Sequence, residues 1–408
     1  MELRTVLSPN YLREFSCIGS ECEDTCCSGW QITIDEKSYN KYQSDQEHEL
    51  SLKSYLKKLE GKSNKEYFAE VILEANSSCP MLNQDRLCSL HKEKGEEYLS
   101  NLCVTYPRVS NIINGIYERS TTLSCPEAAR VVLLKQEGIK FEKIDEALEE
   151  RHLISRKINT NKKVEEKREK FYLIELREFT IKLLQNRNYS LSERLNILGF
   201  FLEEVNNSLS LDEKGRVQLI IEDFKEKILY GEIKEYISIM PKSVTKHLEI
   251  VRKLIDNSIF SGIKDKRYLN SLMEALEGLR YTGSLLCEES VNLYIDANKT
   301  YYEPFIENNE YIMENYLVNT VFKNLFPIKR GILEDYMMLV VHYALIKFQL
   351  IGMMSYHKEN FEIEHVIKLI QSYSRNVEHV NKQPEQFIKV LKENQYTSFK
   401  DMAIFVSF

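Results

Sequence analysis

The chain has 408 residues, of which 43% are hydrophobic and 29% are charged. This composition is typical of a globular protein, and the length suffices for two domains or one large one. The 55 lysines and arginines are outnumbered by 62 aspartates and glutamates, which leaves a net charge of -7. Domains that bind nucleic acids are usually basic, so this charge argues against a nucleic-acid partner.

The N-terminal segment 1–15 carries charges and a proline, and it lacks an apolar run followed by small residues. It therefore does not have the pattern of a secretory signal. We expect a cytoplasmic protein whose thiols are kept reduced. In that compartment disulfides are rare, and clustered cysteines usually bind a metal or act in redox chemistry.

Cysteines are concentrated in the first third of the chain. Thiolates bind soft or borderline metals, and a site needs about four of them delivered from short turns. One of the adjacent Cys26 and Cys27 is expected to be a ligand, while the other packs, bridges or acts as a resolving thiol. The metal-ligand candidates are the eight cysteines at or before residue 125, namely Cys17, Cys22, Cys26, Cys27, Cys79, Cys88, Cys103 and Cys125.

The identity of the metal depends on weaker signals. Cys79 and Cys125 are each followed by proline, as in ferredoxin-type ligand runs, and this favours an iron-sulfur cluster. The spacing lacks the paired Cys-x-x-Cys knuckles that specify a zinc ribbon. Zinc nevertheless stays the alternative metal.

Secondary structure in the first half is predicted from periodicity. Residues 53–74 are predicted to form a helix, and short alternating runs at 30–35 and 111–117 predict strands. Residues 142–170 are rich in lysine and glutamate and contain no glycine or proline. They predict an exposed helix or a helical linker.

The second half has the pattern of a helical domain. Capping boxes at 190–193 and 210–213 predict helix starts, each followed by apolar residues at helical spacing. The apolar run 336–354 is long enough to span a bilayer. It contains His342 and Lys347, which are costly in lipid, so we expect a buried core helix and no membrane insertion.

The expected fold class is therefore mainly α. A cysteine-rich metal-binding region with little strand is expected over residues 1–140. An all-α helical domain is expected over 141–408. We find no glycine-rich turn of the doubly wound cofactor-binding folds and no P-loop.

The sequence around the cysteines resembles the flagellin lysine-N-methylase family. The resemblance continues through 314–319 and 373–379, whereas 136–300 matches in helical character alone. The N-terminal part is also similar to a wider cysteine-rich family described as zinc- or iron-chelating. The strings that carry the resemblance are Phe15–Asp35, which includes Cys-Cys-Ser-Gly-Trp, then Cys79–His91, Leu102–Arg108 and Leu123–Arg130.

The resemblance implies an enzyme of the bacterial flagellum. Its expected reaction is methyl transfer from S-adenosylmethionine to lysine side chains of flagellin, its protein substrate. The cofactors that the resemblance implies are S-adenosylmethionine and an iron-sulfur cluster of the 4Fe-4S type. Two other classes stay open: a non-catalytic metal-binding or redox-sensing adaptor with a structural zinc or iron-sulfur site, and an iron-sulfur oxidoreductase.

Candidate site residues are taken from the strings that resemble the family. A lysine ammonium must lose a proton before it attacks a methyl sulfonium, so a base is required beside it. The candidates for that role are Glu127, Glu378 and His379. The cofactor-binding candidates are Arg108, Arg130 and Arg375, which could pair with a carboxylate, and Asn315, which could bind an adenine or ribose edge.

Ordinary structural roles are the alternatives for these residues. Arg375 and Glu378 are three residues apart and could form a surface ion pair on one helix. Glu127 could be a first-turn residue favoured by the helix dipole. His379 could simply sit at a helix end.

Overall fold

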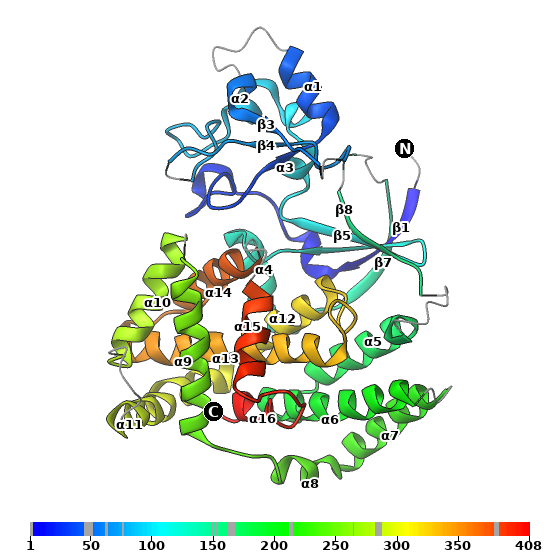
Figure 1. Ribbon diagram of the computed structural model, residues 1–408, viewed down its shortest axis with the longest axis vertical. Coiled ribbons are helices and arrows are strands. Elements are labelled where there is room, and N and C mark those ends of the chain that lie inside the picture. The colour runs from blue at the N-terminus through cyan, green and yellow to red at the C-terminus, as the bar shows by residue number, and fades with distance from the viewer. Residues whose placement is uncertain are drawn as a thin grey trace. The chain divides into compact units, whose positions relative to one another are not determined.

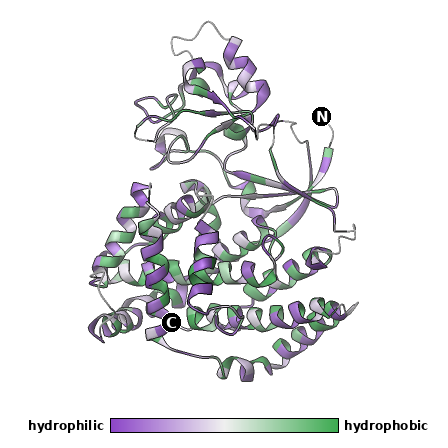
Figure 2. Ribbon diagram, viewed as in Figure 1, coloured by the Kyte–Doolittle hydropathy of each residue, from purple (hydrophilic) through white to green (hydrophobic). Residues whose placement is uncertain are grey.

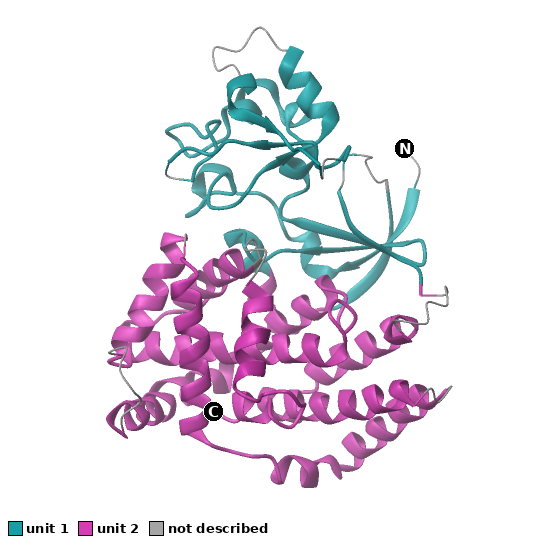
Figure 3. Cartoon of the chain, viewed as in Figure 1, with its two compact units in different colours: residues 1–131, 140–159, 378–380 teal, residues 132–139, 160–377, 381–408 magenta. Residues whose placement is uncertain are grey.

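The computed structural model describes most of the chain in two compact units (Figure 3). The first unit comprises residues 1–131, 140–159 and 378–380, and the second comprises 132–139, 160–377 and 381–408. The described residues are 3–44, 52–61, 64–75, 77–147, 151, 153–160, 168–211, 215–263, 265–281, 288–378 and 383–408.

The larger sheet of the first unit has the strand order β7-β1-β6-β5-β8 (Figure 1). β1 runs parallel to β6 and antiparallel to β7, and β5 runs parallel to β8. A two-residue loop joins β5 to β6, in which Asn114 and Gly115 have φ of 51° and 85°. Positive φ at both positions matches the tight turn whose twist suits a hairpin. The strands are β1 (Leu3–Pro9), β5 (Arg108–Ile113), β6 (Ile116–Thr121), β7 (Phe141–Ala147) and β8 (Ile154–Ile158).

A second, three-stranded sheet has the order β2-β4-β3 and belongs to the cysteine-rich part. Its buried side chains, among them Ile34, Ala69 and Val71, form a small hydrophobic core of their own. The strands are β2 (Thr33–Ile34), β3 (Leu56–Lys58) and β4 (Ala69–Val71). The helices of this unit are η1 (Asn10–Arg13), η2 (Gly19–Glu21), α1 (Glu36–Ser44), η3 (Leu52–Tyr55), α2 (Ser89–Lys94), η4 (Glu96–Tyr98) and α3 (Asn101–Thr105); α4 (Pro126–Leu133) follows.

Two helix predictions in the first half are wrong. The segment 53–74 forms one short 3-10 turn and the strands β3 and β4. The charged segment predicted as a helix begins with β7 and β8, and residues 161–167 lie outside the described residues. β7 and β8 are the two edges of their sheet, where charged side chains discourage pairing with other molecules. The strands predicted near 30–35 and 111–117 are confirmed by β2, β5 and β6.

The second unit is built from helices, which confirms the mainly α fold class. Hydrophobic and hydrophilic residues are interspersed along these helices (Figure 2), as expected for helices that bury one face. The helices are η5 (Arg168–Tyr172), α5 (Leu173–Leu184), α6 (Leu191–Ser210), α7 (Arg216–Tyr230), α8 (Ile233–Ser238), α9 (Val244–Phe260), α10 (Lys266–Gly278), α11 (Glu288–Ala297), the π-helical η6 (Asn298–Tyr302), α12 (Glu303–Lys323), α13 (Ile332–His357), η7 (Lys358–Asn360), α14 (Ile363–Glu378), α15 (Gln383–Glu393) and α16 (Ala403–Val406).

One of the two predicted capping boxes is present. Ser190 accepts a hydrogen bond from the Glu193 amide, and the Glu193 carboxylate accepts one from the Ser190 amide, at the start of α6. The second prediction is wrong, because Ser210 ends α6 and its hydroxyl donates to the carbonyl of Asn206. α7 instead begins after Gly215. A helix that is already hydrogen-bonded continues through a residue that could otherwise have started a new one.

The apolar run 336–354 lies within α13, which is a core helix as predicted. The helix is long and apolar enough to cross a membrane, but 94% of its most apolar stretch is buried inside the fold. α13 packs against α10, and the backbones of the two helices approach each other closely at Gly352. A Cβ atom added to Gly352 would lie 2.3 Å from the Ala275 carbonyl oxygen.

We therefore expect Gly352→Ala to destabilise the protein. Without this contact, alanine would favour the helix by about 1 kcal/mol. Here the added methyl group collides with backbone of α10, and overpacking of this kind costs roughly 1–3 kcal/mol or more. Thermal unfolding followed by circular dichroism measures the effect. A melting temperature equal to or above that of the wild type would contradict the close approach.

Candidate functional site

The first cysteine segment, residues 17–30, is a loop held by its own backbone and by Trp30. The indole of Trp30 donates to the Cys26 carbonyl at 2.9 Å and stacks on Tyr106, with ring centres 5.5 Å apart. The Cys26 and Cys27 sulfurs are 4.0 Å apart. The only tryptophan of the chain thus fixes the position of the adjacent cysteine pair.

The second cysteine segment lies directly against the first. The Cys79 amide donates to the Cys27 carbonyl at 2.7 Å, and Ser28 and Ser78 form an isolated β-bridge. Cys88 precedes α2 and forms a bridge with Leu82. Segments some 50 residues apart in sequence are therefore joined by backbone hydrogen bonds beside their cysteines.

The remaining two cysteines lie in a short helix or directly before one. Cys103 is in α3, and its amide donates to the hydroxyl of the N-cap residue Ser100. Cys125 directly precedes α4, and its carbonyl accepts the first hydrogen bond of that helix from Ala129. The eight cysteines form no disulfides in the described part of the chain.

The thiols interact with one another electrostatically. Hydrogen bonding with Cys26 and Cys88 raises the pKa of the Cys27 thiol. The hydrogen bond between Cys27 and Cys88 lowers the pKa of Cys88 to about 6, because it stabilises the Cys88 thiolate. Burial raises the pKa of Cys79 to about 11, and the charges of Cys88 and Cys26 act in the same direction. Such repulsion among neighbouring thiolates is relieved when a cation binds them.

The donor chemistry of this cluster fits a thiophilic metal group. Its sulfurs come from four chain segments. The three segments that carry Cys27, Cys79 with Cys88, and Cys103 contribute residues to one small hydrophobic core or pack against it. Within the described residues, however, no three histidine, cysteine, aspartate or glutamate side chains are placed to hold a single metal ion. The thiols are thus neighbours without forming a tight mononuclear site.

Two of the predicted polar residues lie beside the cysteines in an ion-pair network. Arg130 pairs with Glu127 at 2.5 Å on α4 and with Glu23 of the first cysteine segment at 2.9 Å. Glu127 is therefore paired with an arginine, and it lies in the first turn of α4, as the structural alternative predicted. The pair joins the loop around Cys22 to the helix that follows Cys125.

Arg108 has a different environment at the start of β5. Its guanidinium lies over the Phe15 ring at 5.2 Å, and it forms no ion pair with another residue that the structure describes. Burial lowers the pKa of Arg108, and the charge of Arg119 lowers it further. The other two candidate arginines, Arg130 and Arg375, each form an ion pair with a carboxylate.

The candidate site residues of the second unit that the structure describes make contacts within the fold. Asn315 is fully buried, and its amide donates to the carbonyls of Leu133 and Lys135 at 3.2 and 2.8 Å. Arg375 is buried and pairs with Asp265 at 3.4 Å. The side chain of Glu378 and the whole of His379 lie outside the described residues.

The sequence reasoning did not find a cavity that the second unit contains. Its lining includes Tyr302, Glu310, Tyr343 and Lys347. The signal that could have found it was the lysine in the middle of an otherwise apolar helix. A charged residue in such a position needs a partner or a ligand.

Comparisons with known proteins show a similarity to lysine N-methylases. The family model described as FliB lysine N-methylase C-terminal domain matches residues 177–405. A lysine-N-methylase of Salmonella typhimurium (strain LT2) is 24% identical over 401 residues, which are 94% of each chain. A lysine-N-methylase of Salmonella choleraesuis matches with the same identity and coverage.

A third relative matches a shorter stretch at higher identity. The flagellar biosynthetic protein FliU of Salmonella muenchen is 34% identical over 130 residues, which are 32% of this chain and 77% of that protein. No solved structure matches the chain. Because the family model covers more than half of the chain, and because two relatives align along nearly its whole length, the protein belongs to the FliB lysine N-methylase family.

Proposed function

We propose that this protein transfers methyl groups from S-adenosylmethionine to lysine side chains of flagellin, and that its N-terminal cysteines hold an iron-sulfur cluster. The observation that carries the proposal is the alignment with two lysine-N-methylases along 94% of each chain. The flagellar name of the FliU relative supports flagellin as the substrate.

The chemistry sets clear requirements. The lysine nitrogen attacks the methyl carbon, a nitrogen-carbon bond forms and the carbon-sulfur bond breaks. The electron pair of the broken carbon-sulfur bond stays on sulfur, which gives S-adenosylhomocysteine. The lysine proton passes to a base. Since an exposed lysine has a pKa of about 10.4, the protein must bind it in a desolvating or basic environment.

The proximity of the thiols supports a cysteine-ligated metal group. The thiols that the structure describes are close enough to influence one another's pKa values. An iron-sulfur cluster is held by four such thiolates. When bound, an iron-sulfur cluster would supply redox or Lewis-acid chemistry or a rigid cross-link of the four segments.

The surrounding residues would then position the cysteines. Trp30 fixes the carbonyl of Cys26, and the Glu23–Arg130–Glu127 network ties the Cys22 loop to the start of α4. The cytoplasm is the proposed compartment, since its reducing conditions keep the cysteines available as ligands.

The test combines metal analysis with a transfer assay. The protein is purified without oxygen, analysed for iron, sulfide and zinc, and incubated with flagellin and methyl-labelled S-adenosylmethionine. We expect iron with sulfide, and label on flagellin lysines identified by mass spectrometry. Flagellin with acetylated lysines is the control and should take up no label. Zinc without iron and no transferred label would instead indicate a metal-binding adaptor.

A further inference from the structure

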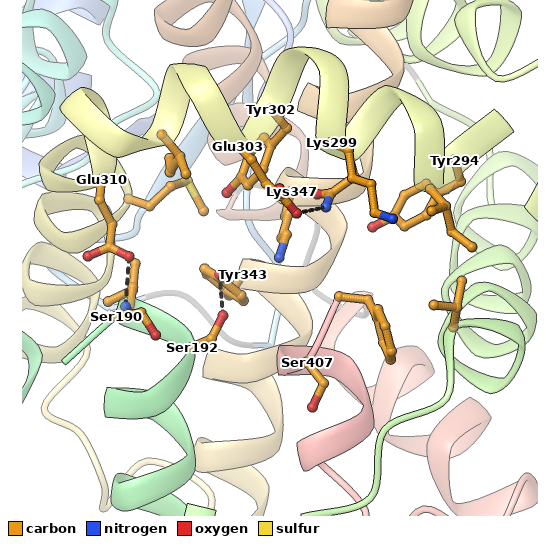
Figure 4. Close-up of a pocket in the computed structure, with 17 residues that line it drawn as sticks. Ser190, Ser192, Tyr294, Lys299, Tyr302, Glu303, Glu310, Tyr343, Lys347 and Ser407 are labelled. Carbon is orange, nitrogen blue, oxygen red and sulfur yellow. Dashed lines mark hydrogen bonds between the residues drawn. The ribbon is translucent and has the colours of Figure 1, made fainter. Parts of the chain in front are cut away.

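The second unit contains a cavity of about 460 Å³ (Figure 4). Its walls come from the starts of α6 and α9, from α11, η6, α12 and α13, and from the C-terminal residues Ser407 and Phe408. Binding sites for small molecules typically measure about 300–1,000 Å³ and combine aromatic walls with a few polar groups. The size and lining of this cavity therefore suit a small ligand.

Lys347 is the unusual residue of the cavity. It comes from the middle of the core helix α13 and is 7% exposed. Its side chain ends in the open space between Tyr302 and Tyr343 (Figure 4), and the ring centres are 5.2 and 6.0 Å from its nitrogen. No hydrogen bond or ion pair joins this nitrogen to any residue in the described part of the chain.

The two carboxylates that line the cavity are engaged elsewhere. Glu310 accepts a hydrogen bond from the Leu191 amide at 2.7 Å and forms an ion pair with Arg194. Glu303 accepts one from the Asn298 amide at 2.8 Å. Neither is bonded to Lys347, although both are close enough to favour its charged form. A buried ammonium without an anion is costly, and a ligand anion would remove that cost.

We propose that this cavity binds a small molecule through its carboxylate, with the Lys347 ammonium as the counter-ion and the tyrosine rings against the rest of the molecule. Aromatic faces attract cations, so Tyr302 and Tyr343 suit a ligand that also carries a positive centre. S-adenosylmethionine has both groups, an amino-acid carboxylate and a sulfonium. The assignment of this ligand rests on the proposed function, whereas the carboxylate site rests on the cavity itself.

The protonation of Lys347 gives this site a pH dependence. Burial lowers the pKa of Lys347 to about 8, while Glu303 and Glu310 oppose the change. The nearby His247 stays neutral above its pKa of about 3, and burial raises the pKa of Tyr343 to about 12. Affinity for a carboxylate should therefore fall as the pH rises through 8. The other charged or titratable groups around the cavity are Arg194, Tyr294, Lys299, Tyr302, Glu303 and Glu310.

The experiment compares three ligands on the full chain with its metal group retained. Equilibrium dialysis measures the affinity for S-adenosylmethionine, S-adenosylhomocysteine and decarboxylated S-adenosylmethionine. We expect the wild type to bind the first two about 10- to 100-fold more tightly than the decarboxylated compound, as a charge-assisted hydrogen bond would give. Lys347→Met should lose that preference. Lys246→Met, which removes an exposed lysine of α9, should keep it.

A second measurement uses the wild type alone, so that it does not depend on the folding of a variant. Acetic anhydride modifies amines, and S-adenosylhomocysteine should protect Lys347 but not Lys246 from acetylation, as read by mass spectrometry. Equal labelling of Lys347 with and without the ligand would overturn the proposal. So would wild-type affinity and preference in a folded Lys347→Met variant, or failure of the wild type to bind any of the three compounds.

The outcomes separate this inference from the proposed function. Methyl transfer to flagellin together with unchanged ligand binding by Lys347→Met would leave the methylase function standing and remove this cavity as the site. Carboxylate-dependent binding without any methyl transfer would support the cavity and contradict the proposed reaction.

Discussion

Cys88→Ser is expected to lose most of the iron of the proposed cluster and to lower the proposed methyl transfer at least about 100-fold. A serine hydroxyl is a much poorer ligand for iron than a thiolate, and changes outside the ligand shell already cost roughly 10- to 100-fold. Cys88 is the thiol whose pKa is lowered to about 6, so it can be a thiolate ligand at neutral pH. Iron and sulfide content and the initial rate of label transfer measure the effect.

The chain supplies its own control for this substitution. Cys287 lies far from the other cysteines in sequence and outside the described residues, and Cys287→Ser should keep both iron and activity. If Cys88→Ser retained wild-type iron and rate, Cys88 would be removed from the ligand set. The same assay on the other seven N-terminal cysteines would identify the remaining ligands and would show which of Cys26 and Cys27 is dispensable.

Glu314→Gln is expected to lower the stability of the second unit by about 3–5 kcal/mol. Arg194 and Glu314 are 0% and 1% exposed and pair at 2.7 Å. Arg187 adds three hydrogen bonds to the same carboxylate, at 2.8, 3.1 and 3.3 Å. Removing one partner of a buried pair leaves the other charge poorly compensated, and this usually costs about that amount.

Thermal and urea unfolding measure this effect. For a unit of this size, the loss corresponds to a fall in melting temperature of about 10 °C. The exposed pair of Glu222 and Lys225 on α7 provides the control, and Glu222→Gln should leave the melting temperature unchanged because water screens exposed pairs. A stability of Glu314→Gln close to that of the wild type would mean that Glu310 alone compensates Arg194.

The prediction extends to a variant that lacks both charges of the Arg194–Glu314 pair. A double variant, Arg194→Met with Glu314→Met, should be more stable than Glu314→Gln, because apolar side chains of similar size often replace a buried ion pair at little cost. Arg187 would then be left near the surface, where water solvates it. A double variant less stable than the single one would show that these charges are needed to form the fold.

Local signals in the sequence predicted a large part of the helical unit. The capping box at Ser190 and the apolar spacing after it depend on residues within one or two turns, so they predict α6 without knowledge of the fold. The core helix around Lys347 was also predicted, because its length and composition are local properties. The capping box predicted at Ser210 was wrong, because no local signal showed that α6 extends to this residue.

The strands β7 and β8 could not be predicted in this way. β1 pairs with β7 across more than 130 residues of sequence, and the charged alternation of an edge strand resembles that of an exposed helix. The ion pair of Arg375 could not be predicted either, because its partner is far away in the sequence. Its partner was sought on its own helix at Glu378, whereas the structure pairs it with Asp265 at the start of α10.

The sequence by itself determined the cysteine motifs, the family and the mainly helical class, because these depend on residue identity and on short-range periodicity. Only the tertiary structure decided which thiols are neighbours, how the charged segment after residue 140 joins a sheet, and where Lys347 points. Each of these depends on contacts between residues far apart in the chain. Such contacts leave no local pattern, since their energy arises only when the chain brings the partners together.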